Sequence, residues 1–250
     1  MAKDLVESLP TNLDKKIRDL GSGIKIIISN KVSFTTDSVL LADFSSSAAK
    51  SKVLEIGSGC GIIPLLWCKN HEIGKITAVE IQKHAFDLMV KSIHLNGLEK
   101  KIFPINKDIK TLSQNSEFIG AFDSVVCNPP YLSFEKPCKI SERTISRHER
   151  TINIEEIIKL SYLFLNNGGY LYLCCRSERL CDVIFYMKQN KIEPKLLKFV
   201  EYLEGKPPKL FLIKGKKNAK TGVIIENNLI LQTKNKNYSN EAKKIYKDFQ

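Results

Sequence analysis

Short apolar runs alternate with longer amphipathic stretches through the middle of the chain. Such runs are typical of strands buried on both faces, and the stretches between them have the length and periodicity of helices. The pattern therefore predicts an α/β fold, in which helices cover both faces of a mostly parallel sheet. The first four strands are expected at residues 52–56, 75–80, 101–106 and 124–127, and the helices at 61–70, 83–96, 154–165 and 178–190.

The last part of the sheet has a different pattern. A turn at 166–169 precedes a fifth strand at 170–175, and two further strand-like runs follow at 196–203 and 209–213. The link between these two runs, residues 204–208, is so short that it suits a hairpin better than a helical crossover. The last strands are therefore expected to be antiparallel.

The chain is long enough for one well-buried core with small additions. At 250 residues and 43% hydrophobic content, one α/β domain over residues 51–250 is expected. An N-terminal extension, residues 1–50, adds a strand at 23–30 and a helix at 37–48. The chain begins without the basic-then-apolar order of a signal peptide, and no apolar run approaches the roughly 20 residues of a membrane span. A cytoplasmic protein with no membrane partner is expected.

The seven cysteines are scattered along the chain and form no C-x-x-C pair. This spacing argues against a disulfide framework and against a zinc site, so no metal is expected. Reduced thiols of this kind mostly act as small buried apolar groups.

The net charge of +12 favours a polyanionic partner, because Lys and Arg side chains that neutralise phosphates release condensed counterions. A skew in coding composition toward Lys, Asn and Ile would also give a basic protein. The charge is unevenly placed, since residues 201–250 hold 11 Lys against four Glu and one Asp, half of the net charge in the last fifth of the chain. This placement favours a nucleic-acid surface.

A glycine-rich turn is expected where the first strand passes into its helix. Glu55 is followed by Gly57, Gly59 and Gly61 in the pattern E-x-G-x-G-x-G. Glycines permit positive φ and let a ligand approach bare backbone, while the start of the helix offers unpaired N–H groups. The spacing differs from the dinucleotide fingerprint G-x-G-x-x-G, and the Gly-Lys-Ser/Thr ending of a P-loop is absent. The turn predicts a nucleotide ligand, although tight strand–helix packing alone could require the same glycines.

Two further acids follow the second and third strands. Glu80 lies where a carboxylate can accept both hydrogen bonds of a ribose diol. Asp108 could accept from an exocyclic adenine amine, with Ile81 and Ile109 as apolar neighbours on the two faces of the ring. Each acid alone is more often a surface residue or a helix cap. Three successive strand ends with matching chemistry point to one nucleotide site.

The fourth strand ends in Asn128-Pro129-Pro130-Tyr131. Together with the glycine turn and the two acids, this resembles the S-adenosylmethionine-dependent methyltransferases that modify planar amines. The resemblance implies a Rossmann-like class I fold, a seven-stranded mostly parallel sheet whose last strand is antiparallel. It also implies that the cofactor S-adenosylmethionine lies across the carboxyl ends of the strands.

In that family the target is an amine on an sp² carbon, whose lone pair is delocalised. The resemblance implies that the side-chain oxygen of Asn128 and the carbonyl of Pro129 each accept one N–H of this amine and turn its lone pair toward the methyl group. Pro130 adds rigidity, so that the acceptors are held in fixed places, and Tyr131 would stack on the target ring. Without the glycine turn, Asn-Pro-Pro is also an ordinary turn sequence.

Outer motifs narrow the resemblance. The stretch 34–42, F-T-T-D-S-V-L-L-A, is similar to one in the bacterial tRNA(Val) adenine-N6 methyltransferase family, as are Arg147-His148-Glu149 and the ending Tyr238-Ser-Asn-Glu with Ile245-Tyr246. The likeness places Thr36 and Asp37 at the methionine end of the cofactor, although both could simply cap a helix. It implies methylation of the N6 amine of an adenosine beside the anticodon of tRNA.

Several basic residues are candidates for contacts with RNA. Arg147 and His148 would bind RNA or close over the base, unless they are simply solvated. The other candidates lie in the basic region near the last strands, where phosphate contacts would position tRNA without reading its sequence. They are Lys206, Lys209, Lys216 and Lys217.

Other functions fit parts of the pattern. The same motif serves enzymes that methylate a glutamine of release factors, but these usually carry a helical domain ahead of the catalytic one. Ribosomal RNA guanine-N2 methyltransferases share the core. A non-catalytic RNA-binding protein of the same fold is a further alternative, which the intact glycine turn and Asn128 motif disfavour. Nothing in the sequence resembles a coiled coil, so a monomer is the default.

Overall fold

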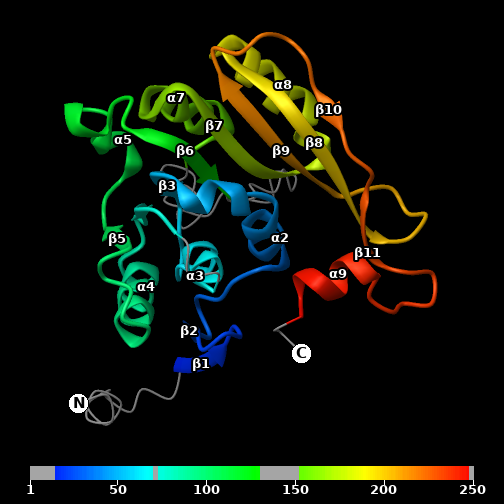
Figure 1. The fold of residues 1–250 in the computed structure, drawn as a ribbon, viewed down its shortest axis with the longest axis horizontal. Coiled ribbons are helices and arrows are strands. Elements are labelled where there is room, and N and C mark those ends of the chain that lie inside the picture. The colour runs from blue at the N-terminus through cyan, green and yellow to red at the C-terminus, as the bar shows by residue number, and fades with distance from the viewer. Residues whose placement is uncertain (1–14, 70–72, 130–151, 248–250) are drawn as a thin grey trace, which may run out of the picture.

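The computed structural model describes residues 15–69, 73–129 and 152–247 of the chain. These residues form one large sheet between two layers of helices, together with a small separate hairpin (Figure 1). Within these ranges, no helix has the length and apolar character that a bilayer crossing requires.

The central sheet is mostly parallel with an antiparallel strand, as predicted. Its main path runs β5-β4-β3-β6-β7-β9-β8, and β9 is antiparallel to both of its neighbours while the other pairs along β5 to β7 are parallel. The predicted hairpin between the last two strands is therefore confirmed. These strands are β3 (Val53–Ile56), β4 (Ile76–Val79), β5 (Ile102–Ile105), β6 (Phe122–Cys127), β7 (Leu165–Arg176), β8 (Ile192–Leu203) and β9 (Leu210–Lys217).

Two short strands extend the sheet beyond the seven expected. Both β10 (Ile224–Ile225) and β11 (Leu229–Gln232) pair in parallel with β8. The sequence analysis did not predict them, because a run of two to four residues carries too little periodicity to identify. Their formation covers the outer edge of β8, whose N–H and C=O groups would otherwise be unpaired.

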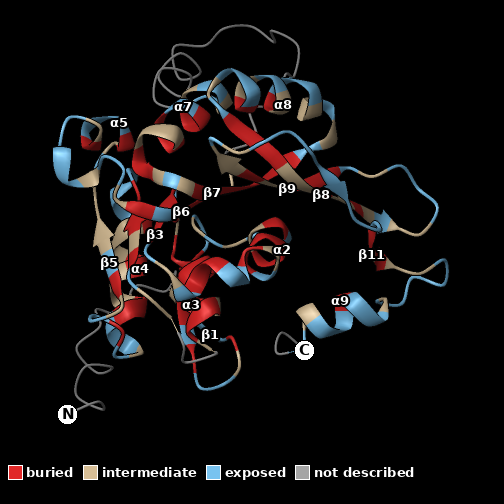
Figure 2. Cartoon of the chain, turned by 45° about the horizontal axis from the view of Figure 1, so that its top comes forward, coloured by how far each residue is buried: buried red, intermediate tan, exposed pale blue. Residues whose placement is uncertain are grey.

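Helices cover both faces of the sheet and bury two separate apolar clusters (Figure 2). On one face the core contains Leu40, Leu65 and Leu88, and on the other it contains Ile157, Phe164 and Val183. The first layer holds α2 (Thr36–Phe44), α3 (Ile62–Cys68) and α4 (Lys83–Leu95), and the second holds α5 (Ile109–Leu112), α7 (Ile154–Phe164) and α8 (Leu180–Gln189).

The N-terminal extension contains a hairpin in place of the single expected strand. Here β1 (Lys15–Asp19) pairs antiparallel with β2 (Lys25–Ser29). The sequence KKIRD of β1 is too polar to indicate a strand. The hairpin is attached to α4, since the Ile27 N–H donates to Ser92 Oγ at 2.9 Å.

Two local expectations are corrected. The helix expected over 37–48 ends at Phe44, where the Ser45 hydroxyl donates to the Leu41 carbonyl, and the 3₁₀ turn η1 (Ser46–Lys50) follows. The turn expected at 166–169 is instead part of β7, which pairs with β6 through a register shift between Phe122 and Ser124. The asparagine–glycine composition there reflects this irregularity within the strand.

The carboxyl-terminal segment packs against the first helical layer. After β11, Ser239 caps α9 (Asn240–Ile245) by accepting from the Ala242 N–H at 3.0 Å, and Ala242 is fully buried. In Figure 1 this helix lies beside α2.

Candidate active site

The carboxyl ends of four parallel strands meet at one edge of the sheet. Ile56 of β3 is in register with Val79 of β4 and Cys127 of β6, and Val79 with Ile105 of β5. The residues that follow these positions therefore emerge side by side. The structure thus brings the glycine turn, Glu80, Asp108 and Asn128 to the same edge, as the sequence predicted.

The glycine turn after β3 has the backbone that only glycine adopts without strain. Gly57, Gly59 and Gly61 have φ values of +74°, +56° and +86°. A Cβ added at Gly57 or Gly59 would meet no atom within 4 Å, whereas one at Gly61 would lie 2.9 Å from Met89 Cγ. Gly61 thus serves helix packing, and the other two glycines leave open space in which a ligand can approach the backbone.

Glu80 organises the turns after β3 and β4. Its Oε2 accepts from the Gly59 N–H at 2.8 Å and its Oε1 from the Gln82 N–H at 2.7 Å. The side chain of Asn106, after β5, donates to the carbonyl of Glu80 at 2.7 Å. Three consecutive strand ends are therefore tied together around one buried carboxylate.

Glu55 is buried beneath the glycine turn, and its Oε2 has no hydrogen-bond partner among the described residues. Burial, partly opposed by Ser58 and assisted by the nearby Glu80 carboxylate, raises the pKa of this carboxyl to about 8. A buried carboxyl with an unused acceptor is the kind of group that a cationic or hydrogen-bond-donating ligand would satisfy.

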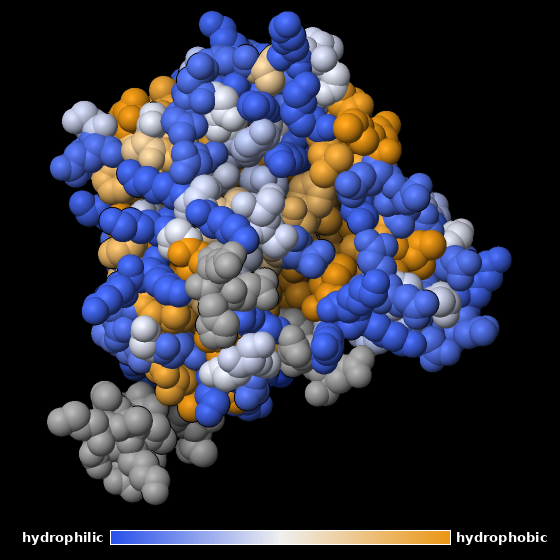
Figure 3. All heavy atoms as spheres, in the orientation of Figure 1, coloured by the Kyte–Doolittle hydropathy of each residue, from blue (hydrophilic) through white to orange (hydrophobic). Residues whose placement is uncertain are grey.

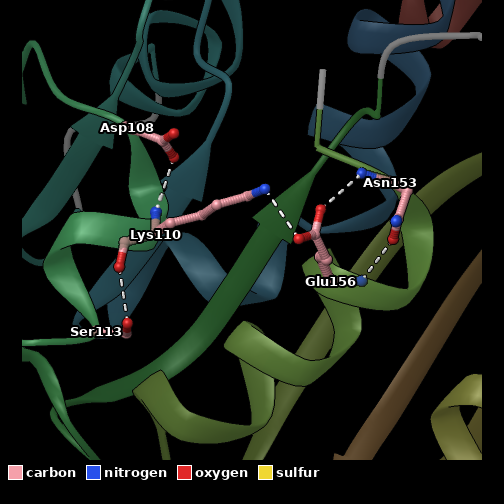
Figure 4. A network of polar contacts seen from close by, with 5 residues as sticks. All are labelled: Asp108, Lys110, Ser113, Asn153 and Glu156. Atoms are coloured by element: carbon pink, nitrogen blue, oxygen red, sulfur yellow. Dashed lines mark hydrogen bonds and ion pairs between the residues drawn. The ribbon is translucent and has the colours of Figure 1, made fainter. Parts of the chain in front are cut away.

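Asp108 caps α5, since its Oδ1 accepts from the Lys110 N–H at 2.9 Å (Figure 4). Lys110 reaches across to α7, where its Nζ lies 2.8 Å from Glu156 Oε1. Glu156 and Asn153 form the capping box of α7. This network ties the segment after β5 to the start of α7.

Ile81 and Ile109 flank this edge with different exposure. The Ile81 side chain is 48% exposed, whereas Ile109 is 5% exposed. Exposed Ile81 is available to a planar ring, and Ile109 belongs to the core beneath α5.

Asn128 is held by the start of α2. Its Nδ2 donates to Ser38 Oγ at 2.9 Å, which fixes the amide so that its oxygen faces away from Ser38. Within the same turn of α2, the buried Asp37 accepts from the Tyr202 hydroxyl of β8 at 3.1 Å, while Thr36 is exposed. The N-terminal extension therefore contributes directly to this edge of the sheet.

Some residues predicted from the motifs lie outside the described ranges. Pro129 is described and half-buried. The structural positions of Pro130, Tyr131, Arg147 and His148 fall in the segment 130–151, which the structure does not describe.

The four candidate lysines separate into two pairs along β9. Lys206 and Lys209 are exposed in the link before β9, at the edge that carries Asn128, because β8 runs parallel to β6 and β7. Lys216 and Lys217 lie at the far end of β9, roughly 23 Å away at the usual rise per residue.

Lys216 and Lys217 also point to opposite faces of the sheet. The Lys217 Nζ donates to the carbonyls of Tyr162 and Leu165, each at 2.7 Å, and burial lowers its pKa. The Lys216 Nζ lies over the Tyr170 ring, 5.1 Å from its centroid. Lys217 therefore has a structural role in closing the end of α7.

The cysteines agree with the expectation of buried thiols. Of the six that the structure describes, five are buried and Cys181 is exposed, and none is in a disulfide. No cluster of three or more His, Cys, Asp or Glu side chains suited to a metal ion occurs in the described ranges.

Sequence reasoning missed three residues of this edge. Asn106 ends a strand as the acids do, so its position was a usable signal. Ser38 and Tyr202 reach the site only through tertiary packing, 90 and 165 residues from their partners Asn128 and Asp37. Ser38 lies inside the motif at 34–42, which could have marked it, whereas no local pattern identifies Tyr202.

The sequence resembles known methyltransferases over most of its length. The profile of the methyltransferase small domain family matches residues 28–190. The tRNA1(Val) (adenine(37)-N6)-methyltransferase of Shewanella putrefaciens is 25% identical over 190 residues, which are 76% of each chain. The protein of the same name from Porphyromonas gingivalis is 28% identical over 183 residues, 71% of each chain. The family resemblance indicated by the motifs is confirmed.

Solved structures show the same fold. A protein described as a predicted O-methyltransferase, from Agrobacterium tumefaciens, matches with a TM-score of 0.68 at 15% identity, over 85% of this chain and 96% of its own. Trm5 of Methanocaldococcus jannaschii, solved in complex with adenosine, matches with a TM-score of 0.58 at 20% identity, over 83% of this chain and 56% of its own. The predicted class I methyltransferase fold is therefore confirmed.

Proposed function

Since the chain belongs to the methyltransferase small domain family, we propose that it transfers a methyl group from S-adenosylmethionine to the N6 amine of an adenosine in tRNA. Its curated relatives carry the name of an enzyme that modifies adenine 37 of tRNA1(Val), and we propose the same nucleoside here. The protein is a methyltransferase by family and by fold.

The described residues fit the cofactor in both shape and chemistry. Open space beside Gly57 and Gly59 admits a ligand against the backbone, and Glu80 presents a carboxylate for the ribose diol. Ile81 offers an exposed apolar surface to the adenine, and Asp108 stands at the next strand end to accept from its amine. Glu55 lies below the turn with an unused acceptor.

The other end of the cofactor would reach the start of α2. Thr36 and Asp37 lie there, beside Asn128, and a carboxylate suits the ammonium group of the methionine part. When bound, S-adenosylmethionine supplies an electrophilic methyl group on a sulfonium.

Asn128 and Pro129 would orient the attacking amine. The Asn128 oxygen and the Pro129 carbonyl each accept one N–H, so the nitrogen lone pair points at the methyl carbon. In this geometry the amine would take the methyl group from the sulfonium, leaving a neutral thioether, and the proton that the nitrogen then sheds would pass to solvent. Tyr131 would stack on the adenine, and Pro130 would stiffen the turn.

One observation carries this proposal, the hydrogen bond from Asn128 Nδ2 to Ser38 Oγ. It holds the amide from the side opposite to its oxygen, so that the oxygen is fixed as an acceptor before any substrate arrives. The acceptor then needs no reorganisation during the reaction, which is the condition for efficient electrostatic catalysis.

The RNA surface is proposed from charge and position. Lys206 and Lys209 are exposed at the edge that carries Asn128, where tRNA phosphates would pass if its adenosine occupied the site. We include Arg147 and His148 on the strength of the motif alone. The partner is tRNA, and the enzyme would act in the cytoplasm.

We also propose a division of labour along the chain. Residues 51–250 form the methyltransferase domain with its basic end, and residues 1–50 form an extension that packs on it and supplies Thr36, Asp37 and Ser38. We propose a monomer, since nothing in the sequence resembles a coiled coil.

A methylation assay tests the proposal. Purified protein, labelled S-adenosylmethionine and separate pools of unmodified tRNA, ribosomal RNA, DNA and release factor would be incubated with wild type and Asn128→Ala. Label in tRNA as N6-methyladenosine is expected, with roughly a hundredfold or more lower kcat in the variant. Label in ribosomal RNA or release factor would contradict the substrate while keeping the chemistry.

A further inference from the structure

The carboxyl-terminal helix α9 docks lengthwise on α2. At one end Lys198 of β8 pairs with Glu241 of α9, with 2.6 Å between Nζ and Oε1, and both charges act on Asp43 near the end of α2. Burial and the Glu241 carboxylate raise the pKa of Asp43, and the Lys198 ammonium opposes them. At the other end, Tyr246 lies near Thr36 and Asp37 at the start of α2. The two helices thus run in opposite directions.

Tyrosines gather around Asp37 at this junction. The Tyr202 hydroxyl donates to Asp37 Oδ1 at 3.1 Å, and Asp37 is only 8% exposed. Tyr246 stands behind this pair, and the Tyr238 ring packs on it with 5.6 Å between the ring centroids. Burial raises the pKa of both Tyr202 and Tyr246, with a further contribution from the Asp37 carboxylate at Tyr202 and from Tyr238 at Tyr246, so both hydroxyls keep their protons at neutral pH.

We propose that Tyr202 is a positioning residue that orients the Asp37 carboxylate toward the amino-acid end of S-adenosylmethionine, and that the segment 238–246 backs it as a wall of that site. The inference rests on the proposed function and deepens it. It also gives a role to the terminal Tyr-Ser-Asn-Glu and Ile-Tyr motif, which the catalytic reaction leaves unexplained.

The chemistry of the pair supports this role. A carboxylate has about four acceptor positions, so one hydrogen bond from Tyr202 fixes its direction and leaves acceptors for an ammonium group. Asp37 is in the same helical turn as Ser38, which holds Asn128, so its orientation is coupled to the place of the target amine. Figure 3 shows apolar surface in the hollow between α2 and the carboxyl-terminal segment.

A comparison of two ligands separates this role from a general effect on folding. S-adenosylmethionine carries the amino-acid end, and 5′-methylthioadenosine lacks it while keeping the nucleoside and a thioether. Binding of both to wild type and Tyr202→Phe would be measured by titration calorimetry. Tyr186→Phe is the matched control, because it removes a hydroxyl from α8, away from this edge.

The expected result is a selective loss. Tyr202→Phe should weaken S-adenosylmethionine binding about tenfold and 5′-methylthioadenosine binding less than twofold, and Tyr186→Phe should change neither. In the methylation assay, KM for the cofactor should rise while kcat stays within about threefold. Tyr246→Phe should also weaken S-adenosylmethionine binding more than 5′-methylthioadenosine binding, but by a smaller factor, because Tyr246 acts through Tyr202 and Thr36.

Other outcomes would overturn the inference. If Tyr202→Phe weakened the binding of both ligands equally, Tyr202 would support the site as a whole and not the amino-acid end in particular. If it weakened the binding of neither, Asp37 would not depend on Tyr202 for its orientation. Failure of the wild type to bind S-adenosylmethionine would instead remove the proposed function, and this inference with it.

Discussion

At the scale of single residues, Glu55 has the largest consequence for pH dependence. Its pKa is raised from 4.5 to about 8 by burial, so the folded protein holds a proton that the unfolded chain releases above pH 4.5. Stability therefore falls as pH rises between these two values and levels off above the higher one. The loss is about 5 kcal/mol by linkage.

Glu55→Gln should remove this pH dependence. Glutamine does not titrate, so the free energy of unfolding of the variant without ligand should change less between pH 5 and 9 than that of the wild type. At pH 9 the variant should be the more stable of the two. Urea denaturation at constant ionic strength measures this, with the exposed Glu117→Gln as control. Parallel curves for wild type and Glu55→Gln would show that Glu55 is ionised in the folded protein.

Individual site residues were predictable where they lie near a strand end or, like Thr36 and Asp37, in a recognisable motif. Glu80 and Asn128 directly follow β4 and β6, and Asp108 lies three residues after the end of β5, so topology brings them together. The partners that hold them are set by packing, and the Ser38 and Tyr202 contacts span 90 and 165 residues. Lys216 and Lys217 are adjacent in the sequence, yet alternation along β9 sends them to opposite faces.

At the scale of elements, the start of α7 connects the catalytic motif to the core. Asn153 Oδ1 accepts from the Glu156 N–H at 2.8 Å, and Glu156 returns a bond to the Asn153 N–H. Asn153→Ala should lower the free energy of unfolding by about 1 kcal/mol, since it removes the side-chain oxygen that accepts from the Glu156 N–H. Urea denaturation tests this, and a change below about 0.3 kcal/mol would contradict it.

The control for this cap is Asn115→Ala. Asn115 caps the three-residue turn η2 by accepting from the Glu117 N–H at 3.0 Å. Because η2 buries none of its residues, its cap should matter less than that of α7. A loss at Asn115 as large as that at Asn153 would show that exposed turns limit stability as much as α7 does.

Elements were predictable in proportion to their burial. The parallel strands are apolar on both faces, and the sequence located each of them within a few residues. The strands β1 and β10 are polar or exposed along nearly their whole length, so no alternation marks them. These two strands form because they pair with β2 and β8, and such pairing cannot be read from the local sequence.

At the scale of the whole molecule, the net charge of +12 is spread over the chain, and only some of the lysines lie where they could contact tRNA near the catalytic edge. The link between β8 and β9 carries Lys206 and Lys209 to the catalytic edge, because β8 runs parallel to β6. Lys216 lies roughly 23 Å away along β9 and faces Tyr170. A phosphate contact near the target adenosine is therefore expected from the first pair and not from Lys216.

Charge reversal separates these positions. Lys206→Glu with Lys209→Glu should weaken tRNA binding about tenfold or more at low salt. The slope of log K against log salt should fall by about 2, because two phosphates are no longer neutralised.

The matched control must change the net charge by the same amount, so it is the double variant Lys214→Glu with Lys216→Glu on β9. This control should weaken tRNA binding less than about threefold. Filter binding at increasing salt measures both, and cofactor affinity, which involves none of these lysines, should stay constant. Equal losses in the two double variants would mean that tRNA crosses the sheet along β9, and the far pair would then belong to the RNA surface.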